Sequence, residues 1–136
     1  FGAVIRGDTG PIRIGAGVSV QDNCVIHVND RDDTIIGNEI VIGHGAILEG
    51  CVIGDGVLIG MNATVLSGAR VGEQAVIAAG AVIREGFEVP AKTLAAGVPA
   101  KLLRQLSPDM LERISSGAAH YRVKGQEYKA ETKIID

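Results

Sequence analysis

Aromatic residues are scarce in this chain of 136 residues, which contains no Trp, two Phe and two Tyr. A core without bulky aromatic anchors must be built from many small side chains at regular positions. The two cysteines are too few for a disulfide scaffold. No apolar run approaches the ~20 residues that span a bilayer, so we expect no membrane segment and a cytoplasmic protein.

Aliphatic residues and glycine dominate instead. The chain is 46% hydrophobic with 19 glycines, and its apolar content is almost all Ala, Val, Ile and Leu. This content and the moderate net charge of −3 exclude a disordered chain. The sequence contains neither a basic stripe nor stacking aromatics, so nucleic acid is excluded as a partner. The length suits one folded domain.

Small apolar residues recur with a fixed period. An aliphatic residue stands at nearly every sixth position, at Ile36, Ile42, Leu48, Ile53, Ile59, Val65, Val71, Ile77 and Ile83. A small or β-branched residue lies two positions before each of them, and glycine often follows. Apolar residues two apart indicate a strand with one buried face, and the glycines indicate corners. The pattern predicts an all-β solenoid, a parallel β-helix with three hexapeptides in each triangular coil.

The chain divides into three predicted segments. The hexapeptide solenoid occupies residues 1–90, with loops inserted at residues 7–12 and 28–33. Its first residues already read as the middle of a coil, so we expect an N-terminal coil to be missing. Residues 91–106 contain Pro99 and are flanked by Pro90 and Pro108, which predicts a turn-rich exit from the solenoid.

A C-terminal helix is predicted for residues 107–130. Ser107 is a suitable N-cap, Pro108 suits the first turn, and Asp109 lies near the positive end of the helix dipole. An apolar stripe at helical spacing predicts packing along the solenoid and consists of Leu111, Ile114, Ala118 and Tyr121.

The predicted period also places polar residues in columns. Aliphatic positions three hexapeptides apart share a face, so Arg6, His27 and Glu49 should stack on one another. Strands in neighbouring coils lie ~4.8 Å apart, which brings His27 and Glu49 close enough to bind one ion. His44 belongs to a second column, above Asp22, on a different face. It can join the other two only from a neighbouring subunit, as in a cyclic trimer.

Three motifs resemble the gamma-class carbonic anhydrase family: RGD at 6–8, VQDNCVIH at 20–27 and IGHGAILEGC at 42–51. The resemblance implies a left-handed coil and a homotrimer with inter-subunit metal sites. The metal would be zinc, or another divalent metal such as iron or cobalt. His27 and the adjacent subunit's His44 would be ligands. The third ligand position, a histidine in the family, is Glu49 here.

Glu49 has two interpretations. It can complete a site of two histidines and one glutamate, an arrangement found in catalytic zinc enzymes. Alternatively it pairs with Arg6, its column neighbour two coils away, or with a cation of a neighbouring subunit.

The resemblance also implies roles around the metal. Arg6 and Asp8 resemble an inter-subunit salt-bridge pair. Gln21 resembles the residue that orients the metal-bound water or bicarbonate, and Asp22 would support a ligand. Tyr121 resembles a helix tyrosine whose hydroxyl reaches the site, although a tyrosine on an apolar stripe is equally explained as core.

Three functions remain open. The ordered motifs predict reversible hydration of carbon dioxide to bicarbonate. The tail, GVPAKLLRQLS followed by a helix with SGAAHYRV, is similar to the phenylacetic-acid-operon and carnitine-operon members of the family. That similarity favours an alternative, a coenzyme A-dependent acyltransferase or thioesterase acting on an acyl-CoA. A catalytically silent scaffold is the third hypothesis, in which Glu49 is the sign of a lost site.

Overall fold

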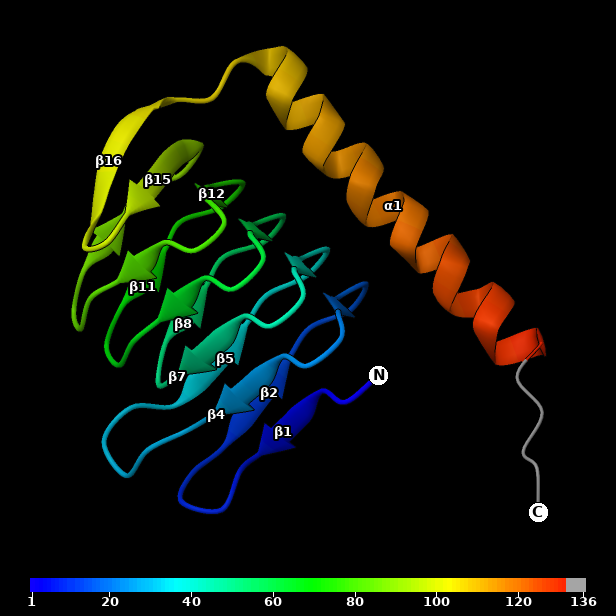
Figure 1. Ribbon diagram of the computed structural model, residues 1–136, viewed down its shortest axis with the longest axis horizontal. Helices are drawn as coiled ribbons and strands as arrows, with labels where there is room; N and C mark the ends of the chain where they lie inside the picture. The colour runs from blue at the N-terminus through cyan, green and yellow to red at the C-terminus, as the bar shows by residue number, and fades with distance from the viewer. Residues whose placement is uncertain (132–136) are drawn as a thin grey trace.

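The protein is a β-solenoid with one long helix beside it, as the computed structural model shows (Figure 1). The structure describes residues 1–131. Three sheets form the faces of the solenoid, and every strand within the repeats pairs in parallel with strands of the coils above and below. This architecture confirms the predicted fold class.

The three faces are named here by their strands. Face A consists of β1 (Val4–Arg6), β4 (Val25–His27), β7 (Ile47–Glu49), β10 (Thr64–Val65) and β13 (Val82–Ile83). Face B consists of β2 (Ile12–Ile14), β5 (Thr34–Ile36), β8 (Val52–Ile53), β11 (Arg70–Val71) and β14 (Glu88–Val89). Face C consists of β3 (Ser19–Val20), β6 (Val41–Ile42), β9 (Leu58–Ile59), β12 (Val76–Ile77), β15 (Thr93–Gly97) and β16 (Ala100–Gln105).

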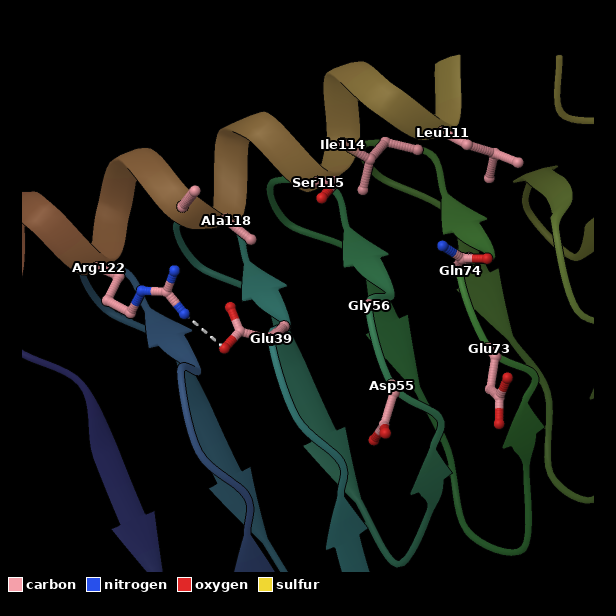
Figure 2. A pocket seen from close by; sticks show the side chains of 11 residues that line it. Glu39, Asp55, Gly56, Glu73, Gln74, Leu111, Ile114, Ser115, Ala118 and Arg122 are labelled. Carbon is pink, nitrogen blue, oxygen red and sulfur yellow. Dashed lines mark hydrogen bonds and ion pairs between the residues drawn. The ribbon is translucent and has the colours of Figure 1, made fainter. Parts of the chain in front are cut away.

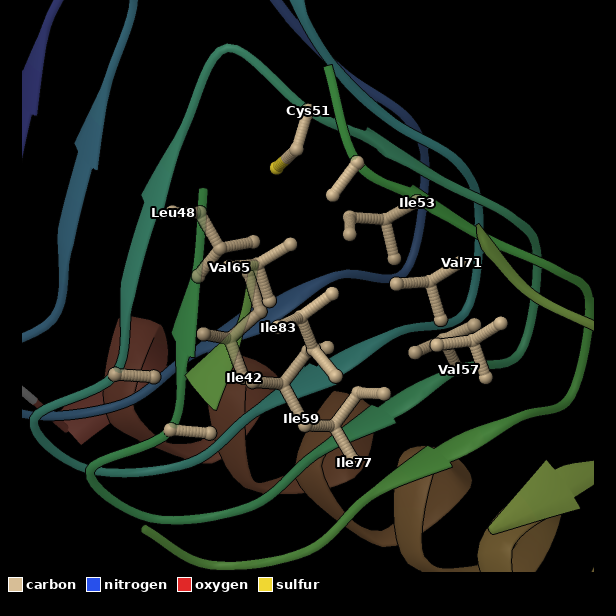
Figure 3. Close-up of a cluster of buried hydrophobic side chains, with 14 of the residues drawn as sticks. Ile42, Leu48, Cys51, Ile53, Val57, Ile59, Val65, Val71, Ile77 and Ile83 are labelled. Carbon is tan, nitrogen blue, oxygen red and sulfur yellow. The ribbon is translucent and has the colours of Figure 1, made fainter. Parts of the chain in front are cut away.

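The strand register follows the period of the sequence. Ile26 pairs with Leu48 and Leu48 with Val65 across neighbouring coils of face A. These inward residues are fully buried, and Figure 3 shows aliphatic side chains from all three faces meeting inside the coil. Both cysteines belong to this core, and burial raises the pKa of the Cys51 thiol to about 12. They serve as small buried residues of the core.

Glycine is required where one coil lies directly on the next. A Cβ added to Gly60 would lie 2.4 Å from the backbone nitrogen of Ala79 in the following coil. At the corners between faces B and C the chain also turns through positive φ, at 69° for Gly17 and 66° for Gly56. Glu39 takes the equivalent place in the coil between them, with φ at 54°.

The exit segment differs from the predicted run of turns. After β14, the chain forms an antiparallel hairpin of β15 and β16 that continues face C, with its turn at Val98 and Pro99. Without this hairpin, β12 would be the open edge of face C, and its backbone N–H and C=O groups would lack partners. β15 supplies these partners, and just after β12 the amide of Ala78 donates to the carbonyl of Ala95 at 2.9 Å. Pro90 and Pro99 lie outside the strands.

The helix α1 (Pro108–Glu131) returns along the solenoid from the last coil towards the first (Figure 1). The hydroxyl of Ser107 accepts a hydrogen bond from the amide of Met110 at 3.4 Å, which agrees with the predicted N-cap. Of the predicted stripe, Ala118 is buried, Leu111 and Ile114 are half-buried, and Tyr121 is exposed at 39%. Within residues 1–131, no helix has both the length and the hydropathy to cross a membrane.

Candidate metal centre

The first predicted column lies on the outer surface of face A. Arg6 pairs with His27 across β1 and β4, and His27 pairs with Glu49 across β4 and β7. Each of these residues follows an inward-facing aliphatic residue, so its side chain points outward from the coil. The predicted stacking of the three residues is confirmed.

The ring of His27 is held by Arg6 at both nitrogens. Its Nδ1 lies 2.8 Å from the backbone carbonyl oxygen of Arg6, and its Nε2 lies 3.0 Å from the guanidinium Nη2. A carbonyl oxygen can only accept, so Nδ1 carries the proton. Nε2 then holds the lone pair, which accepts from the guanidinium. This tautomer is the one in which Nε2 can bind a metal ion.

His44 lies at the corner between faces C and A, directly above Asp22. Its Nδ1 is 3.1 Å from the carboxylate of Asp22, and the amide of Gly45 donates to the carbonyl of Asp22 at 2.9 Å. The carboxylate fixes the proton on Nδ1 and leaves Nε2 free as an acceptor. Both histidines therefore present the same nitrogen, and the stacking of Asp22 and His44 is confirmed.

The carboxylate of Asp8 binds the guanidinium of Arg6. The two side chains form a short ion pair in the loop after β1. Desolvation raises the pKa of Asp8, but the hydrogen bond from Arg6, a backbone hydrogen bond and the nearby positive charges outweigh it and lower that pKa. Among residues 1–131, Arg6 makes no ion pair with Glu49. Of the two interpretations of Glu49, pairing with Arg6 within one protomer is thus not observed.

A buried threonine joins the strands that carry His27 and Glu49. The hydroxyl of Thr34 donates to the carbonyl of His27 and accepts a hydrogen bond from the amide of Gly50, the residue after Glu49, at 2.8 Å. Thr34 is fully buried. The sequence pattern identified it only as a small β-branched residue of the core, and no sequence signal indicates that its hydroxyl links these strand ends.

The two remaining candidate residues lie on the side of face C. Gln21 follows β3, is half-buried, and its amide donates to the carbonyl of Ile42 at 3.0 Å. Tyr121, on α1, lines an apolar cavity of about 330 Å³ together with Val41 and Leu58. Tyr121 therefore lies over the coil that carries His44.

One protomer does not complete a metal site. Within residues 1–131, no group of three or more His, Cys, Asp and Glu side chains is placed to hold one ion. His27 and Glu49 are neighbours on face A, whereas His44 is at the corner with face C. The donors themselves, two imidazoles and a carboxylate, suit zinc and other divalent transition metals. The residue types thus fit a divalent transition metal, while those of a single protomer do not surround one ion.

The chain resembles known proteins along nearly its whole length. A profile described as bacterial transferase hexapeptide (six repeats) matches residues 50–85. The chain is 37% identical over 137 residues to gamma carbonic anhydrase 1, mitochondrial, of Arabidopsis thaliana, covering 96% of this chain and 50% of that protein. It is 46% identical over 121 residues to a probable carbonic anhydrase of Methanocaldococcus jannaschii, covering 89% of this chain and 76% of that protein. The chain belongs to the gamma carbonic anhydrase family of hexapeptide-repeat proteins.

Proteins with other names are also similar. The carnitine operon protein CaiE of Escherichia coli K12 is 42% identical over 109 residues, covering 80% of this chain and 56% of that protein. A crystal structure of a putative acetyltransferase of Bacillus cereus matches with a TM-score of 0.94 and 39% identity, covering 96% of this chain and 76% of that one. This gamma carbonic anhydrase family member spans about half the length of several curated relatives, 50% and 56% in the two cases above.

Proposed function

We propose that this protein is a trimeric metalloenzyme that hydrates carbon dioxide reversibly, with its metal sites between subunits. His27 and Glu49 of one subunit and His44 of the adjacent subunit would hold the ion. One observation carries the proposal: both histidines have Nδ1 next to an acceptor, so Nε2 is the nitrogen with a lone pair in each ring. The family membership supports it.

The surrounding residues have distinct tasks. When bound, the metal acidifies a water molecule for addition to carbon dioxide. Glu49 adds negative charge next to that water, so a higher pH is needed for activity than with three imidazoles. Asp22 keeps the ring of His44 in the productive tautomer. Gln21 lies one residue before Asp22, where its amide can orient the water or bicarbonate.

Arg6 and Asp8 lie at the edge of this site. In one protomer the guanidinium of Arg6 bridges Asp8 and Nε2 of His27. Before a metal can bind to Nε2 of His27, the guanidinium of Arg6 must leave that nitrogen. The guanidinium can then remain bound to Asp8 or pair with a carboxylate of the adjacent subunit. Tyr121 is the candidate hydroxyl group that reaches the site from α1.

A second candidate function is supported by the structural neighbours. The Bacillus cereus structure is called a putative acetyltransferase. A structure from Anaplasma phagocytophilum is called a hexapeptide transferase family protein; it matches with a TM-score of 0.90 and 35% identity over 94% of this chain. Transfer or hydrolysis of the acyl group of an acyl-CoA is therefore the alternative reaction. A panel of acyl-CoA thioesters, assayed with the same metal-loaded protein, separates it from carbon dioxide hydration.

The decisive experiment combines metal analysis with stopped-flow hydration of carbon dioxide. Protein purified without added metal should contain about one ion per subunit and hydrate carbon dioxide above the buffer rate. Glu49→Gln should reduce the bound metal, whereas Glu49→His should retain it and raise the hydration rate near neutral pH. Glu88→Gln, on face B, is the matched control and should change neither.

Each alternative has its own outcome in this experiment. A metal-loaded trimer without hydration above buffer would defeat the enzymatic proposal. Less than about one ion per three subunits would support the silent scaffold, because a structural or catalytic metal is retained during purification.

A further inference from the structure

An ion pair joins α1 to the solenoid across 83 positions of the sequence. The Nη1 atom of Arg122 donates to Oε1 of Glu39 at 2.8 Å, and Figure 2 shows the two side chains reaching across the gap between the helix and the corner of the coil. Among residues 1–131, this is the one ion pair between α1 and the solenoid. Tyr121 directly precedes Arg122 in the sequence.

Packing alone holds α1 weakly. Ala118 is its one buried residue within the described part of the chain. A cavity of about 540 Å³ separates the helix from the corner between faces B and C, where the small side chains of Ser115 and Ala118 stand opposite Gly56 (Figure 2). The apolar cavity beside Tyr121 leaves a second gap, over face C. With space along both sides, apolar contacts do not fix the rotation of the helix about its axis.

Glu39 occupies a backbone position that disfavours its residue type. Its φ of 54° is in the left-handed region, where glycine is the preferred residue and where Gly17 and Gly56 lie in the coils before and after. The left-handed conformation directs the Glu39 side chain from this corner, and its carboxylate there meets Arg122. Lys92 shares the conformation, with φ at 55°, two coils after Gly56.

We propose that Glu39 and Arg122 are positioning residues, whose ion pair fixes the rotation of α1 and thereby holds Tyr121 against Val41 and Leu58, over the coil that carries His44. The consequence for catalysis rests on the proposed function, because it requires Tyr121 to act at the metal site. The placement of Tyr121 itself does not depend on any reaction.

Tyrosine fluorescence tests the placement directly. The chain contains no Trp and two Tyr, so Tyr128→Phe leaves Tyr121 as the single strong fluorophore. In this background, Glu39→Gly should increase quenching of Tyr121 by acrylamide. Lys92→Gly removes a side chain from an equivalent left-handed corner and should not. The double variant Glu39→Arg with Arg122→Glu exchanges the two charges and should restore the quenching of the parent protein. In 1 M NaCl the ion pair is screened, so Glu39→Gly and its parent should be quenched equally.

Limited digestion with trypsin gives a second measure. Cleavage of α1 after Arg113, next to Ile114 in the part of the helix that packs on the solenoid, requires this part of the helix to leave the solenoid, so its rate follows the undocked population. Glu39→Gly should raise this rate about fivefold, the upper range for an exposed ion pair. Equal quenching and equal cleavage in Glu39→Gly and Lys92→Gly, or no recovery in the charge-exchanged protein, would overturn the positioning role.

Kinetics then separate this inference from the proposed function. If the protein hydrates carbon dioxide, Glu39→Gly should lower kcat about fivefold with little change in KM, and should have no further effect in a Tyr121→Phe background. An unchanged kcat alongside increased quenching would refute a positioning role in catalysis. If the parent protein shows no hydration, the proposed function fails, and the fluorescence result alone decides whether the pair positions Tyr121.

Discussion

At the scale of single residues, His27 and His44 differ in what holds their Nδ1 atoms. A backbone carbonyl accepts from His27, whereas the charged carboxylate of Asp22 accepts from His44. A charged carboxylate holds the ring orientation more strongly than a neutral carbonyl does. His44 is also the more exposed ring, with half of its side chain accessible, so it depends more on this partner.

Asp22→Asn should therefore weaken metal binding. The amide of an asparagine can still accept from Nδ1 but carries no charge, and loss of such a partner typically lowers metal affinity about 10–100-fold. Competition with a chromogenic chelator measures the change. Asp55→Asn removes an exposed corner carboxylate that contacts no histidine, and it should leave the affinity unchanged. Equal affinities in the two variants would contradict the role of Asp22.

Asp55 allows a prediction on pH. The backbone amide of Asn38 donates to its carboxylate at 2.7 Å and the side-chain amide adds further hydrogen bonds, and together they lower the pKa of Asp55 below 3.8. The group binds a proton more readily when unfolded, so its stabilising effect is complete above pH 3.8 and disappears as the pH falls through the lower folded-state value.

Urea denaturation of the parent protein and of Asp55→Asn checks this pH dependence. The parent should be the more stable at pH 6, and the difference in free energy of unfolding should shrink towards pH 2.5. A difference that stays constant across this range would show that the carboxylate charge does not contribute.

At the scale of elements, the sequence predicted the strands of the coils but not the hairpin of β15 and β16 that follows them. A triangular coil forces one period on every strand, so nine aliphatic positions were enough to predict which residues pair between coils. The hairpin of β15 and β16 escaped prediction because Pro90 and Pro99 suggested turns, whereas the open edge of β12 decides the local structure. Such an edge is a property of the neighbouring coil, which local sequence does not report.

Two glycine substitutions test what holds the elements together. Gly60→Ala should destabilise the solenoid by about 1–3 kcal/mol, because the new methyl group meets the backbone of Ala79 and cannot be accommodated without a shift of the coil. Gly125→Ala should instead stabilise α1 by up to about 1 kcal/mol, since no atom lies within 4 Å of the added carbon. Thermal unfolding and the helical circular dichroism signal measure the two effects, and a neutral Gly60→Ala would contradict close stacking of the coils.

At the scale of the whole molecule, the sequence placed the candidate ligands but not their partners. The columns of His27 with Glu49 and of Asp22 with His44 follow from the period, because residues after equivalent strands must stack. The tautomers could not be predicted, since the partner of His27 is a backbone carbonyl, which sequence cannot show. The link through Thr34 and the ion pair of Glu39 with Arg122 depend on tertiary geometry alone.

The division of the ligands between two surfaces leads to a prediction on assembly. Ile47 lies two residues before Glu49 on the outer surface of face A and is 43% exposed in the single protomer, as is Val4 at 49%, in the same column of outward-facing residues. If a second copy brings its His44 to this face, these side chains become buried in the interface. A charge at position 47 would then be desolvated without a partner, which strongly disfavours association.

Ile47→Glu should therefore convert the proposed trimer to monomers and abolish the proposed metal binding, while the monomer keeps its solenoid. Ile35→Glu is the matched control, because Ile35 is 37% exposed on face B, which carries none of the candidate ligands. Light scattering after gel filtration gives the mass, metal analysis gives the occupancy, and far-ultraviolet circular dichroism confirms the fold. A monomeric Ile47→Glu protein that still holds one ion per subunit would show that a single chain completes the site, because the ligand from the adjacent subunit would then be dispensable.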